Sequence, residues 1–162
     1  MDIRKASQQE YAAHIKIVRR YYPVDLAQAG SSSLQETKGI AYRQLDASLP
    51  KGRRTPDHFF YTFFDKSIKI GYLWVQRKEE GTLFICSIYI LAKFRSKGYG
   101  SMSMQWLKSK SRQLGCNELL LHVFGHNRRA IDFYLQHGFS IQEKNPLPSM
   151  HMPSMHMYLK LE

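Results

Sequence analysis

The sequence ILAKFRSKGYGS at residues 90–101 contains the pattern R-x-x-G-x-G in Arg95, Gly98 and Gly100. It follows an apolar, strand-like run and precedes a run that is typical of a helix. Glycines let the backbone take up positive φ and approach a ligand closely, and a helix N-terminus attracts negative charge. The turn therefore predicts a binding site for a diphosphate group, although such turns also occur as plain connections.

A second informative sequence is LHVFGHNRRAIDFYLQHGF at residues 121–139. It predicts a strand, a loop, a helix capped by Asn127 and a helix end at Gly138. A Rossmann-type dinucleotide site does not fit, because the glycine pattern comes late in the chain and no ribose-binding acid follows it. In this order and at this distance, the two sequences resemble the GNAT superfamily of acyl-CoA N-acyltransferases. The resemblance covers about residues 60–139 well and the flanking segments more loosely.

The patterns along the chain predict a mixed α/β domain that spans residues 1–162 as a single unit. Strands are expected at residues 3–6, 59–64, 68–76, 83–91, 119–124 and 155–161, and helices at residues 11–22, 33–49, 98–114 and 127–137. Pro23 is expected to interrupt or kink the first helix. Leu34, Ala41 and Leu45 are expected to face inward on the second. The resemblance implies a GNAT fold, with a mostly antiparallel sheet of about six to seven strands flanked by helices.

Composition excludes several classes of protein. The chain has 162 residues, of which 43% are hydrophobic, and this suffices for one globular core. Its longest apolar stretch, residues 82–92, is too short to span a bilayer, and the first ten residues lack the apolar core of a signal peptide. Cys86 and Cys116 form neither a disulfide framework nor a metal-ligand cluster. We therefore expect a cytoplasmic protein with no membrane partner.

The formal net charge of +11 calls for a negatively charged partner or a strongly solvated surface. The basic residues are scattered, and no nucleic-acid-binding motif accompanies them. The hypothesis of a nucleic-acid-binding module therefore rests on charge alone, and we expect no nucleic-acid partner. Lys97, Arg128 and Arg129 lie within or beside the two sequences quoted above, where they would attract the phosphate groups of CoA.

The C-terminal region contains a tandem repeat, PSMHM at residues 148–152 and again at residues 153–157. Methionine and histidine together can bind soft metal ions such as copper. The alternative is a loop and a strand whose methionines pack inward. We expect no metal, because neither a third type of ligand nor a closed site is visible.

The resemblance implies that the chain transfers an acetyl group from acetyl-CoA to an amine. It implies that the backbone of Ile88, Tyr89 and Ile90 pairs with the pantetheine arm, which Asn127 also contacts. The same resemblance places the pyrophosphate on a loop of seven residues: Arg95, Ser96, Lys97, Gly98, Tyr99, Gly100 and Ser101. It further implies that Tyr134 gives a proton to the departing thiolate, a role that a phenol can fill. A core tyrosine is the structural alternative.

The general base departs from the family pattern. Many relatives have a carboxylate near position 87, where this chain has Ser87. Some relatives that acetylate protein N-termini have a glutamate on the fifth strand, twelve residues before the tyrosine, and His122 stands there. A histidine near its usual pKa can take a proton from an ammonium group. His122 is therefore the candidate base, and a packed strand histidine is the alternative.

The acceptor amine is not indicated by the sequence. In this fold the early helices and the turn before the second strand usually form the acceptor site, and here that region contains Tyr21, Tyr22, Asp57, His58, Phe59 and Tyr61. Aromatic side chains suit a small amine or a peptide end, and they suit a hydrophobic core equally well. A polyamine site would need several carboxylates, and no cluster of them occurs here. A non-catalytic acyl-CoA sensor on the same fold stays an alternative, and a homodimer stays open.

Overall fold

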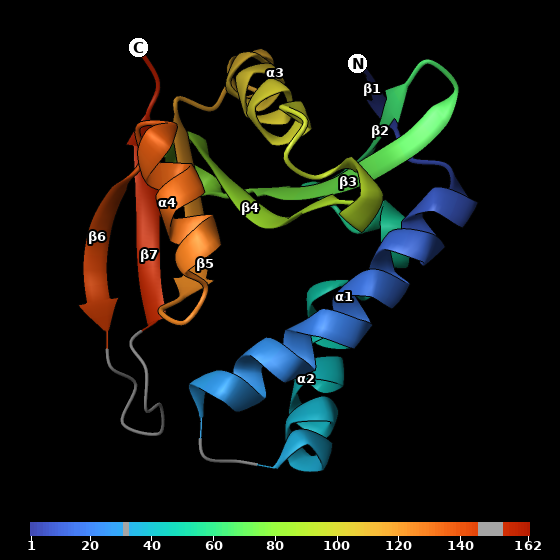
Figure 1. The fold of residues 1–162 in the computed structure, drawn as a ribbon, viewed down its shortest axis with the longest axis vertical. Helices are drawn as coiled ribbons and strands as arrows, with labels where there is room; N and C mark the ends of the chain where they lie inside the picture. The colour runs from blue at the N-terminus through green and yellow to red at the C-terminus, as the bar shows by residue number, and fades with distance from the viewer. Residues whose placement is uncertain (31–32, 146–153) are drawn as a thin grey trace.

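The computed structural model describes residues 1–30, 33–145 and 154–162, which form a seven-stranded sheet flanked by helices (Figure 1). The strands are β1 (Asp2–Lys5), β2 (His58–Asp65), β3 (Ile68–Arg77), β4 (Thr82–Ile90), β5 (Glu118–Phe124), β6 (Ser140–Asn145) and β7 (Ser154–Lys160). The helices are α1 (Gln8–Ala29), α2 (Leu34–Ser48), α3 (Tyr99–Gln113) and α4 (Arg128–Gln136). The strand order is β1-β2-β3-β4-β5-β7-β6. Only β4 and β5 pair in parallel among these strands, so the predicted fold class is confirmed.

Local sequence explains where α1 and α2 begin. Ser7 accepts a hydrogen bond from the backbone of Glu10, whose side chain accepts one from the backbone of Ser7. Ser33 and Glu36 repeat this capping box at α2, as predicted. Leu34, expected to face inward, is exposed because it lies at the first position of the helix.

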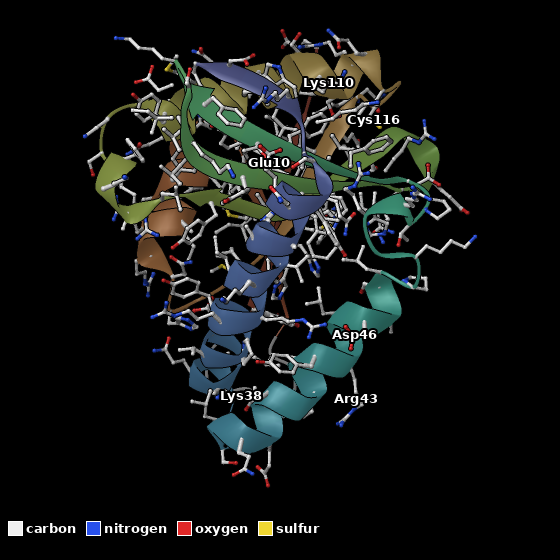
Figure 2. All side chains as sticks on the ribbon, turned by 90° about the vertical axis from the view of Figure 1, so that its right-hand side faces the viewer. Glu10, Lys38, Arg43, Asp46, Lys110 and Cys116 are labelled. Atoms are coloured by element: carbon white, nitrogen blue, oxygen red, sulfur yellow. The ribbon has the colours of Figure 1, made fainter. Side chains whose placement is uncertain are left out.

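Of the two expected effects of Pro23, the interruption is wrong, because α1 continues through this residue to Ala29, and a kink stays a prediction. A proline inside a helix removes one backbone hydrogen bond, so packing must hold the segment. Pro23 is itself buried, and the neighbouring Tyr22 hydroxyl donates a 2.8 Å hydrogen bond to Gln44 of α2. Figure 2 shows α1 and α2 side by side, extending away from the sheet.

Two hydrophobic cores cover opposite faces of the sheet. The larger core joins strand residues such as Leu83 to Met104 of α3 and Ile131 of α4. The smaller core joins Trp74 of β3 to Leu45 of α2. Figure 1 accordingly shows α3 on one side of β2–β4 and the α1–α2 pair on the other. No helix in the described part of the chain is both long and apolar enough to cross a membrane.

The C-terminal strands close the sheet. Met155 and Met157 of β7 are buried in the larger core, so these methionines of the second PSMHM copy pack inward. The first copy lies outside the described residues. The sequence patterns do not indicate β6, whose segment SIQEKN contains a single apolar residue, Ile141. β6 forms at the outer edge because β7 supplies its backbone partners.

Candidate active site

β4 and β5 diverge in the middle of the sheet. They pair in parallel from Thr82 opposite Glu118 to Ile85 opposite Leu121, and their ladder ends there. Beyond this point β4 stays paired with β3 on its other edge, up to Ile90. Between residues 86 and 90, the edge of β4 that faces β5 therefore has no strand partner within the described chain. Such an edge presents backbone N–H and C=O groups that an extended ligand can pair with.

The loop between β4 and α3 carries the glycine pattern. Gly98 caps α3 with φ 83°, in the left-handed region, and no side chain caps this end of the helix in the described residues. Since Met102 is the first amide to bond back, to the carbonyl of Gly98, the N–H groups of Tyr99, Gly100 and Ser101 have no partner within the helix. These amides and the helix dipole suit an anion.

Two arginines hold this loop against its neighbours. Arg95 donates a 2.9 Å hydrogen bond from Nε to the carbonyl of Ile90, and its guanidinium lies 5.1 Å from the centre of the Tyr89 ring. Arg129, at the start of α4, donates to Ser96 Oγ at 3.2 Å. The turn is thereby tied to the end of β4 and to α4.

A cleft of about 800 Å³ opens where β4 and β5 diverge. Of the predicted site residues, it is lined by Ile88, Tyr89, Ile90, Arg95, Gly100, His122, Asn127 and Tyr134. Ser96, Lys97, Gly98, Tyr99 and Ser101 are not among its lining residues. The side chain of Tyr99 points away and donates a 2.6 Å hydrogen bond to Asp65, and Ser101 Oγ lies 3.1 Å from Nε2 of His137. Because these two side chains contact other residues, the backbone N–H groups are what Tyr99 and Ser101 can offer to a ligand.

α4 brings two of the predicted residues to the cleft. Asn127 caps the helix, and its Oδ1 accepts a 3.2 Å hydrogen bond from the amide of Ala130, which leaves the side-chain NH₂ group for other partners. Tyr134 lies about two helical turns after Asn127, is 8% exposed, and joins the larger core at the cleft wall. Burial raises the pKa of its phenol, so this group keeps its proton at neutral pH.

A family model for the acetyltransferase (GNAT) family matches residues 17–139, which is most of the chain. The chain belongs to the GNAT family of acetyltransferases. Within that family, the uncharacterized N-acetyltransferase YdgE of Bacillus subtilis (strain 168) is 32% identical over 97 residues, which cover 57% of this chain and 62% of that protein. The match thus spans less than two thirds of this relative.

Two solved structures share the GNAT fold of this chain. The Bacillus subtilis protein YycN, a provisionally assigned acetyltransferase, superposes with a TM-score of 0.82 at 24% identity, over 88% of this chain and 94% of that one. The PaiA N-acetyltransferase of Thermoplasma acidophilum, crystallised with coenzyme A, gives a TM-score of 0.72 at 18% identity, over 98% of each chain. At these identities the likeness concerns the fold.

His122 lines the GNAT cleft from the side opposite to Tyr134. Its neighbours Leu121 and Val123 pack in the larger core with Tyr134, and strand side chains alternate, so His122 points to the α1 side of the sheet. The His156 ring of β7 lies across the strands at 5.4 Å between ring centres. Burial, and then the neighbouring His156, lower the pKa of His122 from its ordinary value of 6.5. The imidazole is therefore neutral at physiological pH and free to accept a proton.

Ser87 lines the cleft at the position where many GNAT relatives have a carboxylate. Its Oγ lies 2.9 Å from Nε2 of His14, a residue of α1 that is 1% exposed. The His14 ring stacks on Tyr72 at 5.2 Å between ring centres, and burial lowers its pKa to about 4. This pair puts two neutral groups at the cleft wall where those relatives have a charged one, and no sequence pattern links residues that lie 73 positions apart.

The acceptor region predicted from the sequence is only partly at the cleft. Tyr21, Tyr22 and His58 line it, whereas Asp57 forms an ion pair with Arg77 at 2.7 Å. Phe59 and Tyr61 belong to the larger core, on the opposite face of the sheet. Sequence reasoning missed the wall residues Asp25, Gln44, Ser48 and Gln76. Gln44 lies one turn beyond Ala41, an expected inward position, so helical spacing could have found it, whereas Asp25 lies beyond the expected end of the first helix at residue 22.

Proposed function

We propose that this chain is an acetyl-CoA-dependent N-acetyltransferase in which an amine attacks the thioester directly, with both substrates bound. The observation that carries the proposal is the unpaired edge of β4 between residues 86 and 90, which opens into a cleft between a buried tyrosine and a neutral histidine. Membership of the GNAT family supports acyl transfer as the reaction. Acetyl-CoA supplies the activated acetyl group as a thioester.

The residues of the cleft fit the parts of acetyl-CoA. The N-terminus of α3, where three amides have no partner within the helix, suits the diphosphate, and Arg129 and Lys97 add positive charge beside it. The edge of β4 at Ile88 and Ile90 suits the amide groups of the pantetheine arm, and the side-chain amide of Asn127 faces the same space. A cofactor bound in this way would have its thioester in the gap between β4 and β5.

The chemical step then needs one proton acceptor and one proton donor. The nitrogen lone pair of the amine attacks the carbonyl carbon, so a C–N bond forms and the C–S bond breaks. His122 accepts the proton that the nitrogen loses, and the Tyr134 hydroxyl gives its proton to the sulfur. The two side chains point to opposite faces of the sheet, which matches an amine that arrives from the α1 side and a thiol that leaves toward α4.

The deciding experiment measures thiol release from acetyl-CoA over a panel of amines, together with acetyl-CoA binding by calorimetry. We expect turnover with at least one amine. The second candidate function is a non-catalytic acyl-CoA sensor, which the neutral His14–Ser87 pair in place of a carboxylate favours. Tight binding without turnover over the whole panel would support the sensor and reject the enzyme.

A further inference from the structure

The two ends of the cleft carry opposite charge. At the cofactor end the lining includes Arg95 and Arg129. The wall contributed by α1 and α2 contains no lysine or arginine, and its one charged residue is Asp25. The other lining residues of these helices are Ile17, Val18, Tyr21, Tyr22, Gln44, Leu45 and Ser48. In a chain with a net charge of +11, this wall is locally suited to a cation.

His126 fixes the carboxylate of Asp25. The Asp25 Oδ1 atom lies 3.4 Å from Nε2 of His126, whose side chain is 16% exposed and stacks on Phe124. Nδ1 of His126 is buried and has no hydrogen-bond partner in the described chain. A proton on Nδ1 would be a buried N–H group without a partner, so the geometry favours Nε2 as the atom that donates to Asp25 Oδ1. The other carboxylate oxygen, on a side chain that is 42% exposed, has no partner among the described residues.

Two tyrosines share the α1 wall with this carboxylate. Tyr21 and Tyr22 precede it by one turn of α1 and line the same cleft. The Tyr21 hydroxyl lies 3.3 Å from that of Tyr89, and Tyr22 is held by its bond to Gln44, so both rings are fixed. Aromatic faces attract cations, and a carboxylate beside them adds a charged hydrogen bond.

The subsite lies at a distance from the reacting atoms. The ring centres of His122 and Phe124 lie 4.9 Å apart, and those of Phe124 and His126 lie 5.7 Å apart. A cation on Asp25 is therefore separated from an amine beside His122 by the Phe124 ring. The reacting nitrogen must be neutral to attack, so the charged group on Asp25 is a second one.

We propose that the α1 wall is an acceptor subsite in which Asp25, held by His126, binds the second cationic group of a long diamine-type acceptor. One carboxylate serves one cation, so the acceptor class is a substrate with two amines separated by an extended apolar chain. The inference rests on the proposed function in one respect, because that function makes the first amine the nucleophile.

The test compares a long linear diamine with the amino alcohol of the same chain length, which lacks only the second amine. Dissociation constants are measured by calorimetry for the wild-type protein and for Asp25→Asn, each with and without coenzyme A. Asp46→Asn is the matched control, because Asp46 lies on α2 in Figure 2 and pairs with Arg19 at 2.6 Å without lining the cleft. A short diamine completes the set.

We expect the wild-type protein to bind the long diamine roughly two- to fivefold more tightly than the amino alcohol, the range for a half-exposed ion pair. Asp25→Asn should bring this ratio to about one, and Asp46→Asn should keep it. A ratio near one in the wild type, or a ratio that persists in Asp25→Asn, overturns the inference. Absence of turnover with every amine, alongside Asp25-dependent diamine binding, would instead reject the proposed reaction and keep the cation subsite.

Discussion

At the scale of single residues, Tyr134→Phe removes one hydroxyl from the cleft and keeps the ring that packs in the core. If the phenol protonates the leaving thiolate, kcat should fall by roughly a hundredfold to ten-thousandfold, while the acetyl-CoA dissociation constant changes little. Steady-state kinetics and calorimetry measure the two quantities. Tyr158→Phe is the control, because Tyr158 is exposed on β7 and does not line the cleft. Full activity in Tyr134→Phe would reduce the tyrosine to a packing role.

His122 predicts a pH dependence. A general base must be deprotonated, so the rate should rise with pH through the pKa of His122, which burial and His156 place below 6.5. In the wild-type protein, the part of the pH–rate profile that is due to His122 should therefore be close to its plateau at pH 7. In His122→Ala the rising limb should move upward, toward the pKa of the amine itself. An identical pH–rate profile in this variant would show that another group accepts the proton.

At the scale of the element, α3 offers a matched pair of glycines. Gly98 precedes the helix with φ 83° and Gly115 follows it with φ 74°, and a Cβ atom would meet nothing within 4 Å at either position. Valine at either site should destabilise the protein by roughly 1–2 kcal/mol through the positive φ alone. Only Gly98→Val should also weaken acetyl-CoA binding, by tenfold or more, because it distorts the amides at the helix N-terminus. Equal acetyl-CoA affinities in the two variants would remove the assignment of this loop.

The elements that the sequence predicts well are those determined by local chemistry. The glycines at residues 98, 115 and 138 mark helix ends because positive φ is a property of a single residue, and all three have it in the structure. β6 has no such signal, since its stability comes from β7 alone. The predicted interruption at Pro23 also fails for a non-local reason, because the packing of α1 on α2 outweighs the tendency of a proline to end a helix.

The candidate site is predictable only where a family motif covers it. The loop at residues 95–101 and the helix with Asn127 and Tyr134 are contiguous in sequence, so their order suffices to find them. The contact of Asp25 with His126 joins residues that are 101 positions apart, and the His14–Ser87 pair joins residues that are 73 apart. No periodicity records such contacts. They form because α1 lies along the cleft that opens between β4 and β5.

At the scale of the whole molecule, the net charge of +11 should affect acetyl-CoA capture. Exposed charges near the phosphates are screened by salt, so affinity should fall as ionic strength rises. Arg129→Gln should weaken binding about two- to fivefold at low salt and flatten this dependence. Arg43→Gln, on α2 in Figure 2 and outside the cleft lining, should leave both unchanged. Calorimetry in a series of salt concentrations measures this, and a flat dependence in the wild type would show that the basic surface serves another purpose.

The stability of the whole fold should depend on His14. Burial lowers its pKa to about 4, against 6.5 in an unfolded chain, so between these values the unfolded state binds more protons than the folded one. Stability is then complete above pH 6.5 and falls as the pH drops toward 4, by up to about 3 kcal/mol from this residue. Urea unfolding at pH 7.5 and pH 5 measures the loss. His14→Met should remove much of it, whereas His137→Gln, at a more exposed histidine, should keep most of it. An acid sensitivity that His14→Met does not reduce would mean that the imidazole is hydrated and charged in the folded protein, and Ser87 would then face the cleft beside a cation.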